Sequence, residues 1–124
     1  MAICLTPTHT GRVQLEKRGG HTVARLFGEL SYYDLDAWVP NLSIALSDPG
    51  SKLVLDLSQV EHVDSAAIGN LVALVAEANT KSCRVILASP NPYVAGVLEV
   101  TRLDTFFEVC PSVEEAEARL GGAG

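Results

Sequence analysis

Four side chains that could take part in catalysis lie within ten residues: Asp56, His62, Asp64 and Ser65. A serine hydroxyl beside a histidine base and a carboxylate is the usual set for nucleophilic catalysis. The surrounding sequence argues against that use, because Ser65 lacks the Gly-x-Ser-x-Gly elbow that exposes a hydrolase nucleophile. A nucleotide-binding Gly-x-Gly-x-x-Gly or Walker loop is also absent from the sequence. A phospho-acceptor aspartate is disfavoured as well, since the earlier strand ends lack the acidic pair that holds Mg²⁺.

Ser65 is better placed to carry a modification. The apolar segment Leu53–Leu57 predicts a buried strand, a short polar loop follows it, and a helical pattern begins at Asp64-Ser65. A helix N-terminus presents free N–H groups and partial positive charge, which would stabilise a phosphate on Ser65. Two plainer roles stay open: Ser65 is only the N-cap, or Asp64 is the cap and the Ser65 hydroxyl is free. Asp56, at the expected strand end, is expected to order the loop.

Composition excludes several classes of function. The chain has 124 residues, 48% of them hydrophobic, with a net charge of −6 and a pI of about 4.9. Such an acidic chain without a basic patch is not expected to bind nucleic acid. Its apolar runs are too short for a membrane span, and its first residues do not resemble a signal peptide. Three cysteines without metal-ligand spacing predict a cytoplasmic protein with no metal, and no cofactor is expected.

Apolar periodicity predicts alternating strands and helices. The predicted elements, in chain order, are strands 13–17 and 22–27, a helix over 35–46, strand 53–57, a helix with its core face at 68–78, strand 83–88, a short helix from 92, strand 106–109 and a helix over 112–120. Gly19-Gly20 predicts a tight hairpin turn between the first two strands. Pro40 predicts a kink or a helix start, and residues 121–124 are expected to fray.

Two helix starts have clear caps. Asn91 is expected to cap the short helix, with Pro92 at its first position. Ser112 and Glu115 form the capping box of the last helix. A hairpin followed by βα units predicts an α/β fold: one domain with its core over about 11–120, a mixed sheet of about five strands, and about four helices.

At four places the residues resemble those of STAS domains, specifically stand-alone domains of the anti-sigma-factor antagonist type. Gly28-Glu29-Leu30 is similar to the family's Gly-Glu-Leu-Asp, and Leu53–Ser58 to its strand ending in Asp-Leu-Ser. Val63–Gly69 is similar to its Asp-Ser-(Ser/Thr)-Gly-Leu-Gly, and Ser112–Leu120 to its closing helix. The resemblance covers roughly residues 11–120. It implies a STAS-like fold.

The resemblance also implies a function. Ser65 would be phosphorylated by an anti-sigma factor that has a histidine-kinase-like serine kinase fold. The unphosphorylated domain would bind that kinase and free a sigma factor, and the phosphorylated domain would release the kinase. The implied neighbours of the phosphosite are Asp56, Asp64, Ala66, Ala67 and Gly69. The expected partner-binding residues, gathered at one end of the sheet, are Glu29, Ser31, Tyr32, Tyr33, Glu61, His62 and Tyr93.

The sequence departs from the family pattern at two positions. Ser31 stands where relatives often have Asp, and Ala67 replaces the first glycine of Gly-Leu-Gly, which adds a Cβ where a kinase would approach. Without phosphorylation, the alternatives are a STAS subunit of an ABC-type lipid or solute transporter, or a stressosome-like scaffold. In each case the sequence predicts a protein-interaction module and not an enzyme.

Overall fold

The described residues of the computed structural model, 12–30, 40 and 42–121, contain one five-stranded sheet in the order β1-β2-β3-β4-β5. The strands are β1 (Arg12–Arg18), β2 (His21–Leu30), β3 (Lys52–Val63), β4 (Arg84–Ala88) and β5 (Glu108–Cys110). β1 and β2 form the predicted antiparallel hairpin, and β2, β3, β4 and β5 run parallel. The predicted α/β fold with a mixed sheet is confirmed.

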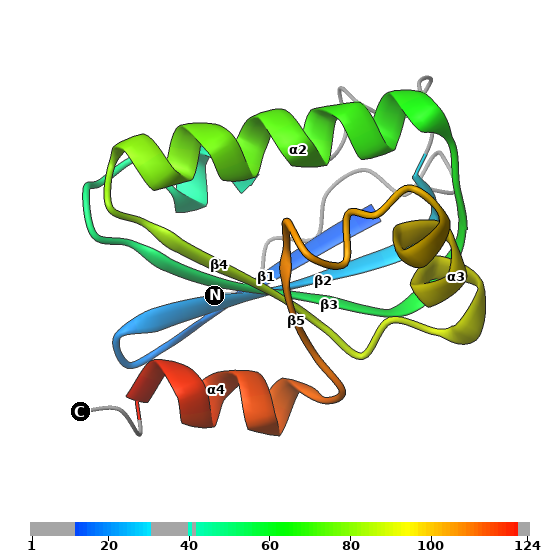
Figure 1. Ribbon diagram of the computed structural model, residues 1–124. Coiled ribbons are helices and arrows are strands. Elements are labelled where there is room, and N and C mark those ends of the chain that lie inside the picture. The colour runs from blue at the N-terminus through cyan, green and yellow to red at the C-terminus, as the bar shows by residue number, and fades with distance from the viewer. Residues whose placement is uncertain (1–11, 31–39, 41, 122–124) are drawn as a thin grey trace.

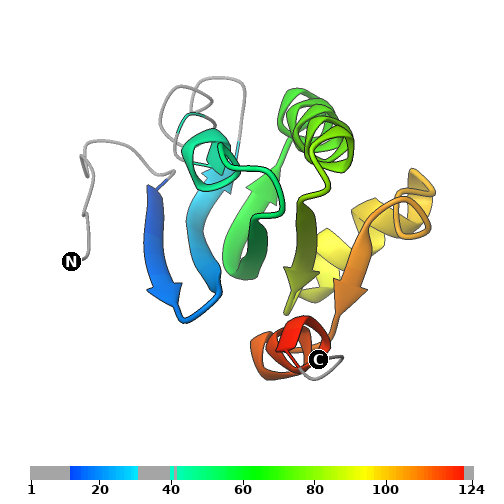
Figure 2. The same cartoon turned by 90° about the vertical axis from the view of Figure 1, so that its left-hand side faces the viewer.

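The helices cover both faces of this sheet. α2 (Ser65–Thr80) and the helical residues 42–45 lie on one face, and α4 (Val113–Gly121) lies on the other, while α3 (Pro92–Val100) follows β4 (Figures 1 and 2). Pro40 is also helical. Of the helix predicted over 35–46, residues 35–39 and 41 fall outside the described residues, and Leu46 lies in a turn and not in the helix.

The alternation of side chains along the strands produces two cores. Leu53 and Leu55 point toward α2 and join its Leu71 and Val75 in the larger core. The intervening Val54 points the other way and belongs to the smaller core beneath α4. Because β3 is buried on both faces, its first half reads as a continuous apolar run.

β3 is longer than the sequence predicted. Residues 58–63 were expected to form a polar loop, but they continue the strand and pair with β2 up to Val63. Between Arg25 and Phe27 of β2, and again between Gly28 and Glu29, β3 holds one residue more than β2. These bulges bend the strand and interrupt the alternation of buried and exposed residues. The sequence of residues 58–63 therefore lacks the two-residue periodicity of a regular strand.

The remaining elements follow the prediction closely, with one shift. Asn91 caps α3 through Val94 N at 2.8 Å, and Ser112 Oγ accepts from Glu115 N at 3.1 Å at the start of α4. The last strand was predicted at 106–109 but covers Glu108–Cys110, because Phe106 ends a turn that follows α3. Apolar character alone did not separate that turn from the strand.

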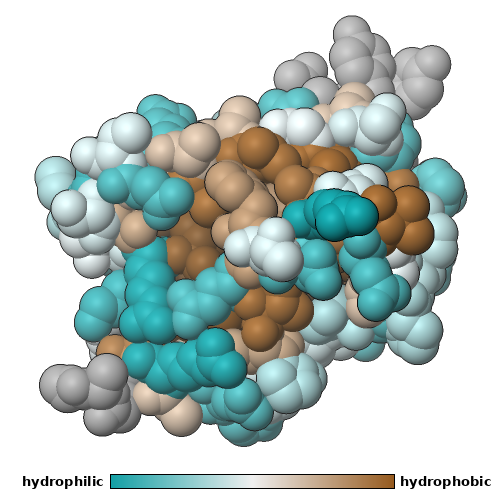
Figure 3. All heavy atoms as spheres, in the orientation of Figure 1, coloured by the Kyte–Doolittle hydropathy of each residue, from teal (hydrophilic) through white to brown (hydrophobic). Residues whose placement is uncertain are grey.

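The surface of the molecule carries exposed apolar residues, and two cysteines lie buried in its interior. Figure 3 shows apolar side chains at the surface between α2 and α4, on the side where β5 lies. Val100 and Phe106 are the most exposed large apolar residues near this part of the chain, at 83% and 43%. Cys83 and Cys110 are buried free thiols, whereas Cys4 lies outside the described residues, as do 122–124. No helix among the described residues is long and apolar enough to cross a membrane.

Candidate functional site at the start of α2

Asp64, and not Ser65, caps α2. Asp64 has an extended backbone, and its Oδ1 accepts a hydrogen bond from Ala67 N at 2.9 Å. Its backbone oxygen accepts from Ile68 N at 3.1 Å. Ser65 is the first helical residue, and its side chain is exposed. Of the two possibilities that the sequence left open, the structure shows the one in which the serine hydroxyl takes no part in capping.

The first turn of α2 keeps anion-binding capacity. Ala67 N and Ile68 N are occupied by Asp64, but in the described part of the chain the amides of Ser65 and Ala66 have no acceptor. α2 also has no acidic residue in its first turn. Unpaired N–H groups and the positive end of the helix dipole are the features that stabilise a phosphate.

Ala67 does not face the surface that a kinase would approach. Its side chain is fully buried and packs in the core beneath α2. The glycine-to-alanine departure from the family pattern therefore fills core space, and the expected obstruction of an approaching kinase does not arise. Gly69 lies on the exposed side of the helix, and a Cβ built there would meet no atom within 4 Å.

Three of the predicted partner-binding residues come together beside the start of α2. Glu29 at the end of β2 pairs with His62 of β3. The His62 ring stacks on that of Tyr93 from α3, with centroids 5.6 Å apart and planes inclined by 21°. The Tyr93 hydroxyl lies 3.2 Å from both His62 Nδ1 and Val63 O. This contact holds the first turn of α3 against the strand that leads into Ser65.

Asp56 is not part of this group. It lies in the middle of β3, paired with Arg25, and not at a strand end. Arg25 pairs with Asp56, and Leu30 pairs with Val63 at the end of β3. These two β2 residues are five positions apart, so Asp56 lies about 16 Å from the end of β3, at roughly 3.3 Å per residue. The carboxylate is buried, accepts from Ser58 N at 3.0 Å and lies 3.6 Å from Arg25 Nε. The predicted loop-ordering role thus becomes a bulge-ordering one.

The other predicted site residues are placed as follows. Ala66 is half-buried in the first turn of α2, and Glu61 is exposed in the second bulge of β3. Ser31, Tyr32 and Tyr33 lie outside the described residues. Sequence reasoning identified Asn91 only as a cap and missed that its side-chain amide also donates to Val60 O of β3. No local pattern signals that second bond, because it joins residues 31 positions apart.

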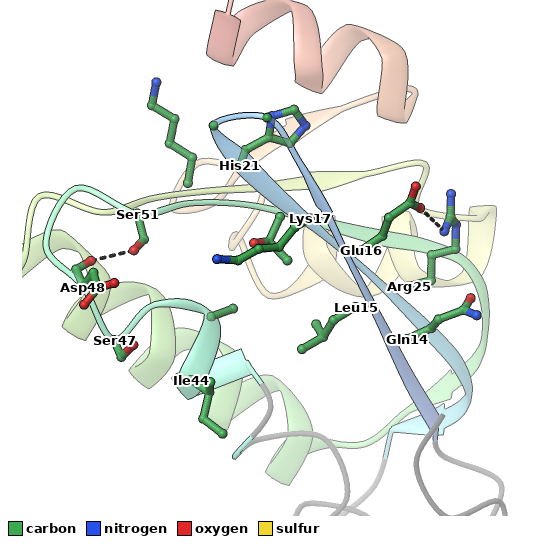
Figure 4. A pocket seen from close by; sticks show the side chains of 15 residues that line it. Gln14, Leu15, Glu16, Lys17, His21, Arg25, Ile44, Ser47, Asp48 and Ser51 are labelled. Atoms are coloured by element: carbon green, nitrogen blue, oxygen red, sulfur yellow. Dashed lines mark hydrogen bonds and ion pairs between the residues drawn. The ribbon is translucent and has the colours of Figure 1, made fainter. Parts of the chain in front are cut away.

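A large groove lies elsewhere on the described chain. A groove of about 750 Å³ opens between the β1–β2 hairpin and the segment from Ile44 to Ser51, near the start of β3 (Figure 4). Leu15, Lys17 and Asp48 are among the residues that line it. Neither this groove nor a smaller cavity at the C-terminal end of α2 includes Ser65. The described residues hold no group of three or more His, Cys, Asp or Glu side chains arranged to bind a metal.

Comparison with known proteins gives the same fold. A candidate anti-sigma factor antagonist of Thermotoga neapolitana is 32% identical over 72 residues, which are 58% of this chain and 64% of that protein. A second, from Thermotoga maritima, is 33% identical over 53% of this chain and 58% of its own length. The chain thus matches about three fifths of each of these curated relatives.

Solved structures align over more of the chain. The anti-sigma factor antagonist SpoIIAA in its unphosphorylated form is 26% identical, with a TM-score of 0.74 over 89% of this chain and 96% of the other. SpoIIAA of Bacillus in its phosphorylated form is 24% identical, with a TM-score of 0.67 over 87% and 98%. The family model of the STAS domain matches residues 12–116. This chain therefore belongs to the STAS domain family.

Proposed function

We propose that this protein is a cytoplasmic anti-sigma factor antagonist, a binding switch without enzymatic activity of its own. In this proposal its partner is an anti-sigma factor with a histidine-kinase-like serine kinase fold. The unphosphorylated protein binds that kinase, and phosphorylation of Ser65 releases it. Support comes from the family membership, from relatives named for this function and from the geometry at the start of α2.

The observation that carries the proposal is the exposed Ser65 hydroxyl at the first position of α2. Because Asp64 supplies the cap, phosphorylation of Ser65 does not cost the helix its capping bond. The amides of Ser65 and Ala66, which have no acceptor among the residues that the structure describes, could bind phosphate oxygens. A serine that served as the cap would have its oxygen engaged in the folded state. Here the acceptor atom is accessible without local unfolding.

Phosphorylation would change the charge of a small surface abruptly. A phosphoserine adds about −1.5 to −2 charges and three acceptor oxygens. Asp64 and the exposed Glu61 already make the surroundings acidic. A kinase surface that fits the neutral serine would then have to desolvate an anion of high charge density, and mismatched charge at an interface costs several kcal/mol. Release of the partner follows from that mismatch.

The partner surface in this proposal surrounds Ser65. Tyr93 is 43% exposed, and His62, Glu29 and Gly69 are exposed around the same helix start. An exposed tyrosine held by a stacked ring is a rigid anchor that loses little entropy on binding. The bare backbone at Gly69 permits close approach from the outer side of α2.

The experiment begins with capture of the partner from native lysate by the immobilised unphosphorylated protein. Mass spectrometry identifies the captured protein, and incubation with ATP is followed by phosphosite mapping. We expect a protein with a histidine-kinase-like ATP domain, release of that protein on ATP addition, and phosphate on Ser65. Ser65→Ala should capture the kinase and retain it in the presence of ATP. Ser58→Ala, which alters an exposed serine of β3, is the control and should behave as wild type.

Two results would contradict the proposal. The first is phosphate on Ser58 with Ser65 unmodified, which would move the switch to the bulged part of β3. The second is capture of a permease–ATPase complex with no modification after ATP addition, which would instead make the chain a transporter subunit.

A further inference from the structure

β3 extends beyond its neighbour on one side. β4 ends at Ala88, which pairs with Asp56, while β3 continues for seven more residues, from 57 to 63. β2 accompanies β3 to the end, so hydrogen bonding on that side is maintained. On the β4 side the strand loses its partner. Backbone carbonyls at such an edge need other donors when water is partly excluded.

Asn91 supplies the first of these donors. Its Nδ2 donates to Val60 O, and its Oδ1 accepts from Val94 N at 2.8 Å. One amide group therefore caps α3 and ties that cap to the extension of β3. Val60 is itself fully buried, so its carbonyl lies in a place where an unpaired acceptor would be costly.

Tyr93 supplies the second donor, three residues further along β3. Its hydroxyl donates to Val63 O at 3.2 Å. A phenol has one proton, so the same oxygen can interact with His62 Nδ1, also at 3.2 Å, only by accepting from that nitrogen. The ring stack on His62 adds a lateral contact. Val63 precedes Ser65 by two residues.

We infer that Asn91 and Tyr93 are positioning residues that fix the β3–α2 junction and thereby orient the Ser65 hydroxyl. β4 does not reach the end of β3. The hydrogen bonds from Asn91 and Tyr93 take the place of the bonds that β4 would make to this last part of β3, before α2 begins. This inference deepens the proposed function, on which its phosphotransfer consequence rests, but the structural consequence stands without any partner. Removal of either hydrogen bond, from Asn91 to Val60 or from Tyr93 to Val63, should increase the motion of the end of β3 together with the Asp64 cap.

Two variants each remove one of these hydrogen bonds with little other change to the side chain. Tyr93→Phe keeps the ring and removes only the hydroxyl. Asn91→Asp keeps an oxygen to cap α3 and removes the amide donor to Val60. Thr101→Val is the control, since it removes a hydroxyl that binds Val97 O at 2.7 Å at the opposite end of α3. All three changes keep side-chain size nearly constant.

The first measurement is amide hydrogen exchange of the unmodified protein, read at Ala67 and Ile68, whose amides donate to Asp64. Both test variants should speed exchange there by about fivefold, the factor that corresponds to a net hydrogen bond of about 1 kcal/mol. Leu87 in β4 serves as the internal reference and should not change. Thr101→Val should leave Ala67 and Ile68 unaffected. Exchange within twofold of wild type in both test variants would overturn the inference.

The second measurement is the rate of Ser65 phosphorylation by the cognate kinase. A positioning role predicts that Tyr93→Phe lowers kcat and changes KM little. A higher KM with unchanged kcat, together with unchanged exchange, would show that the hydroxyl only contacts the partner and would overturn the positioning role. Failure of the wild type to be phosphorylated would count against the proposed function alone, because the exchange result does not depend on the kinase.

Discussion

At the scale of single residues, Asp64 and Ser65 have different roles in the proposed switch. The cap is made by Asp64, through its bond to Ala67 N. The adjacent hydroxyl remains exposed at the positive end of the helix. In the proposed switch, stability and signalling therefore depend on two neighbouring side chains, so one can change without loss of the other.

This division predicts different costs for two neighbouring substitutions. Asp64→Ala should lower the free energy of unfolding by about 0.5–2 kcal/mol, because it removes the cap of α2. Ser65→Ala should change it by less than about 0.5 kcal/mol, since the hydroxyl makes no capping bond. Chemical denaturation at neutral pH measures both. Equal losses for the two variants would mean that Ser65 shares the capping role.

The sequence left open whether Asp64 or Ser65 caps α2, and the structure shows that Asp64 does. Ser and Asp are both strong N-caps, so Asp64-Ser65 fits two helix starts one residue apart. Only the backbone of Asp64, extended at φ −99° and ψ 175°, decides between them. Ala67 illustrates the same limit. Ala67 departs from the family motif, but whether its side chain faces solvent or the core becomes clear only from the structure, which shows it buried.

At the scale of elements, the bulged second half of β3 leads directly into α2, so Ser65 lies just beyond the C-terminal end of this strand. Gly28 of β2, at φ +79°, lies beside the second bulge, where β3 holds an extra residue at Glu61. Only glycine adopts that conformation without strain. The family-like Gly28-Glu29-Leu30 thus has a physical reason, which sequence comparison alone does not supply: it lets β2 follow a bent partner strand.

Gly28→Ala should therefore destabilise the protein by about 1–2 kcal/mol, the usual cost of a left-handed conformation for a residue with a Cβ. Gly96→Ala in α3 is the matched control. A Cβ there meets no atom within 4 Å, and alanine favours helix, so this variant should gain up to about 1 kcal/mol. Thermal unfolding of the two variants should give shifts of opposite sign. A neutral Gly28→Ala variant would contradict the role given to this glycine.

Element boundaries could be predicted where one physical signal dominated. The Gly19-Gly20 turn and the Asn91 cap were located correctly because each depends on a local backbone preference. The extension of β3 could not be predicted, since its bulges space the buried Val60 and Val63 three residues apart. That spacing fits neither a regular strand nor a helix. The pairing with β2 that stabilises it is a tertiary effect.

At the scale of the whole molecule, one carboxylate links the edge of the sheet to α4. Glu108 of β5 binds Arg84 of β4 through Nε at 3.0 Å and Nη2 at 2.7 Å, and lies 3.4 Å from Nη1 of Arg119 in α4. The hydrogen bonds from Arg84 lower the pKa of Glu108 below its ordinary value of 4.5. The charged form is thus favoured in the folded protein.

The sign of the resulting pH dependence follows. Because the folded pKa of Glu108 is depressed, its contribution is fully present above about pH 4.5 and is lost as the pH falls through the lower folded pKa. Glu108→Gln should therefore cost about 1 kcal/mol or less at pH 7, as for a partly exposed ion pair, and the difference from wild type should shrink below pH 4.5. Denaturation midpoints from pH 3 to pH 7 measure it. Glu114→Gln, an exposed residue of α4, is the control, and a pH-independent difference for Glu108→Gln would contradict the assignment.

The groove near the hairpin is distant from the proposed switch. The groove near the hairpin and the Ser65 surface lie at opposite ends of β3, whose twelve residues separate them. A switch at Ser65 should accordingly leave the groove unchanged. In the proposed switch, the charge state of Ser65 alone decides whether the partner binds.

The most direct test of that claim is the dissociation constant of the kinase partner for two homogeneous forms of this protein, unmodified and phosphorylated at Ser65, measured by titration calorimetry without ATP. We expect the phosphorylated form to bind the kinase at least about tenfold more weakly, a difference of about 1.4 kcal/mol. Dissociation constants that agree within about twofold would contradict it.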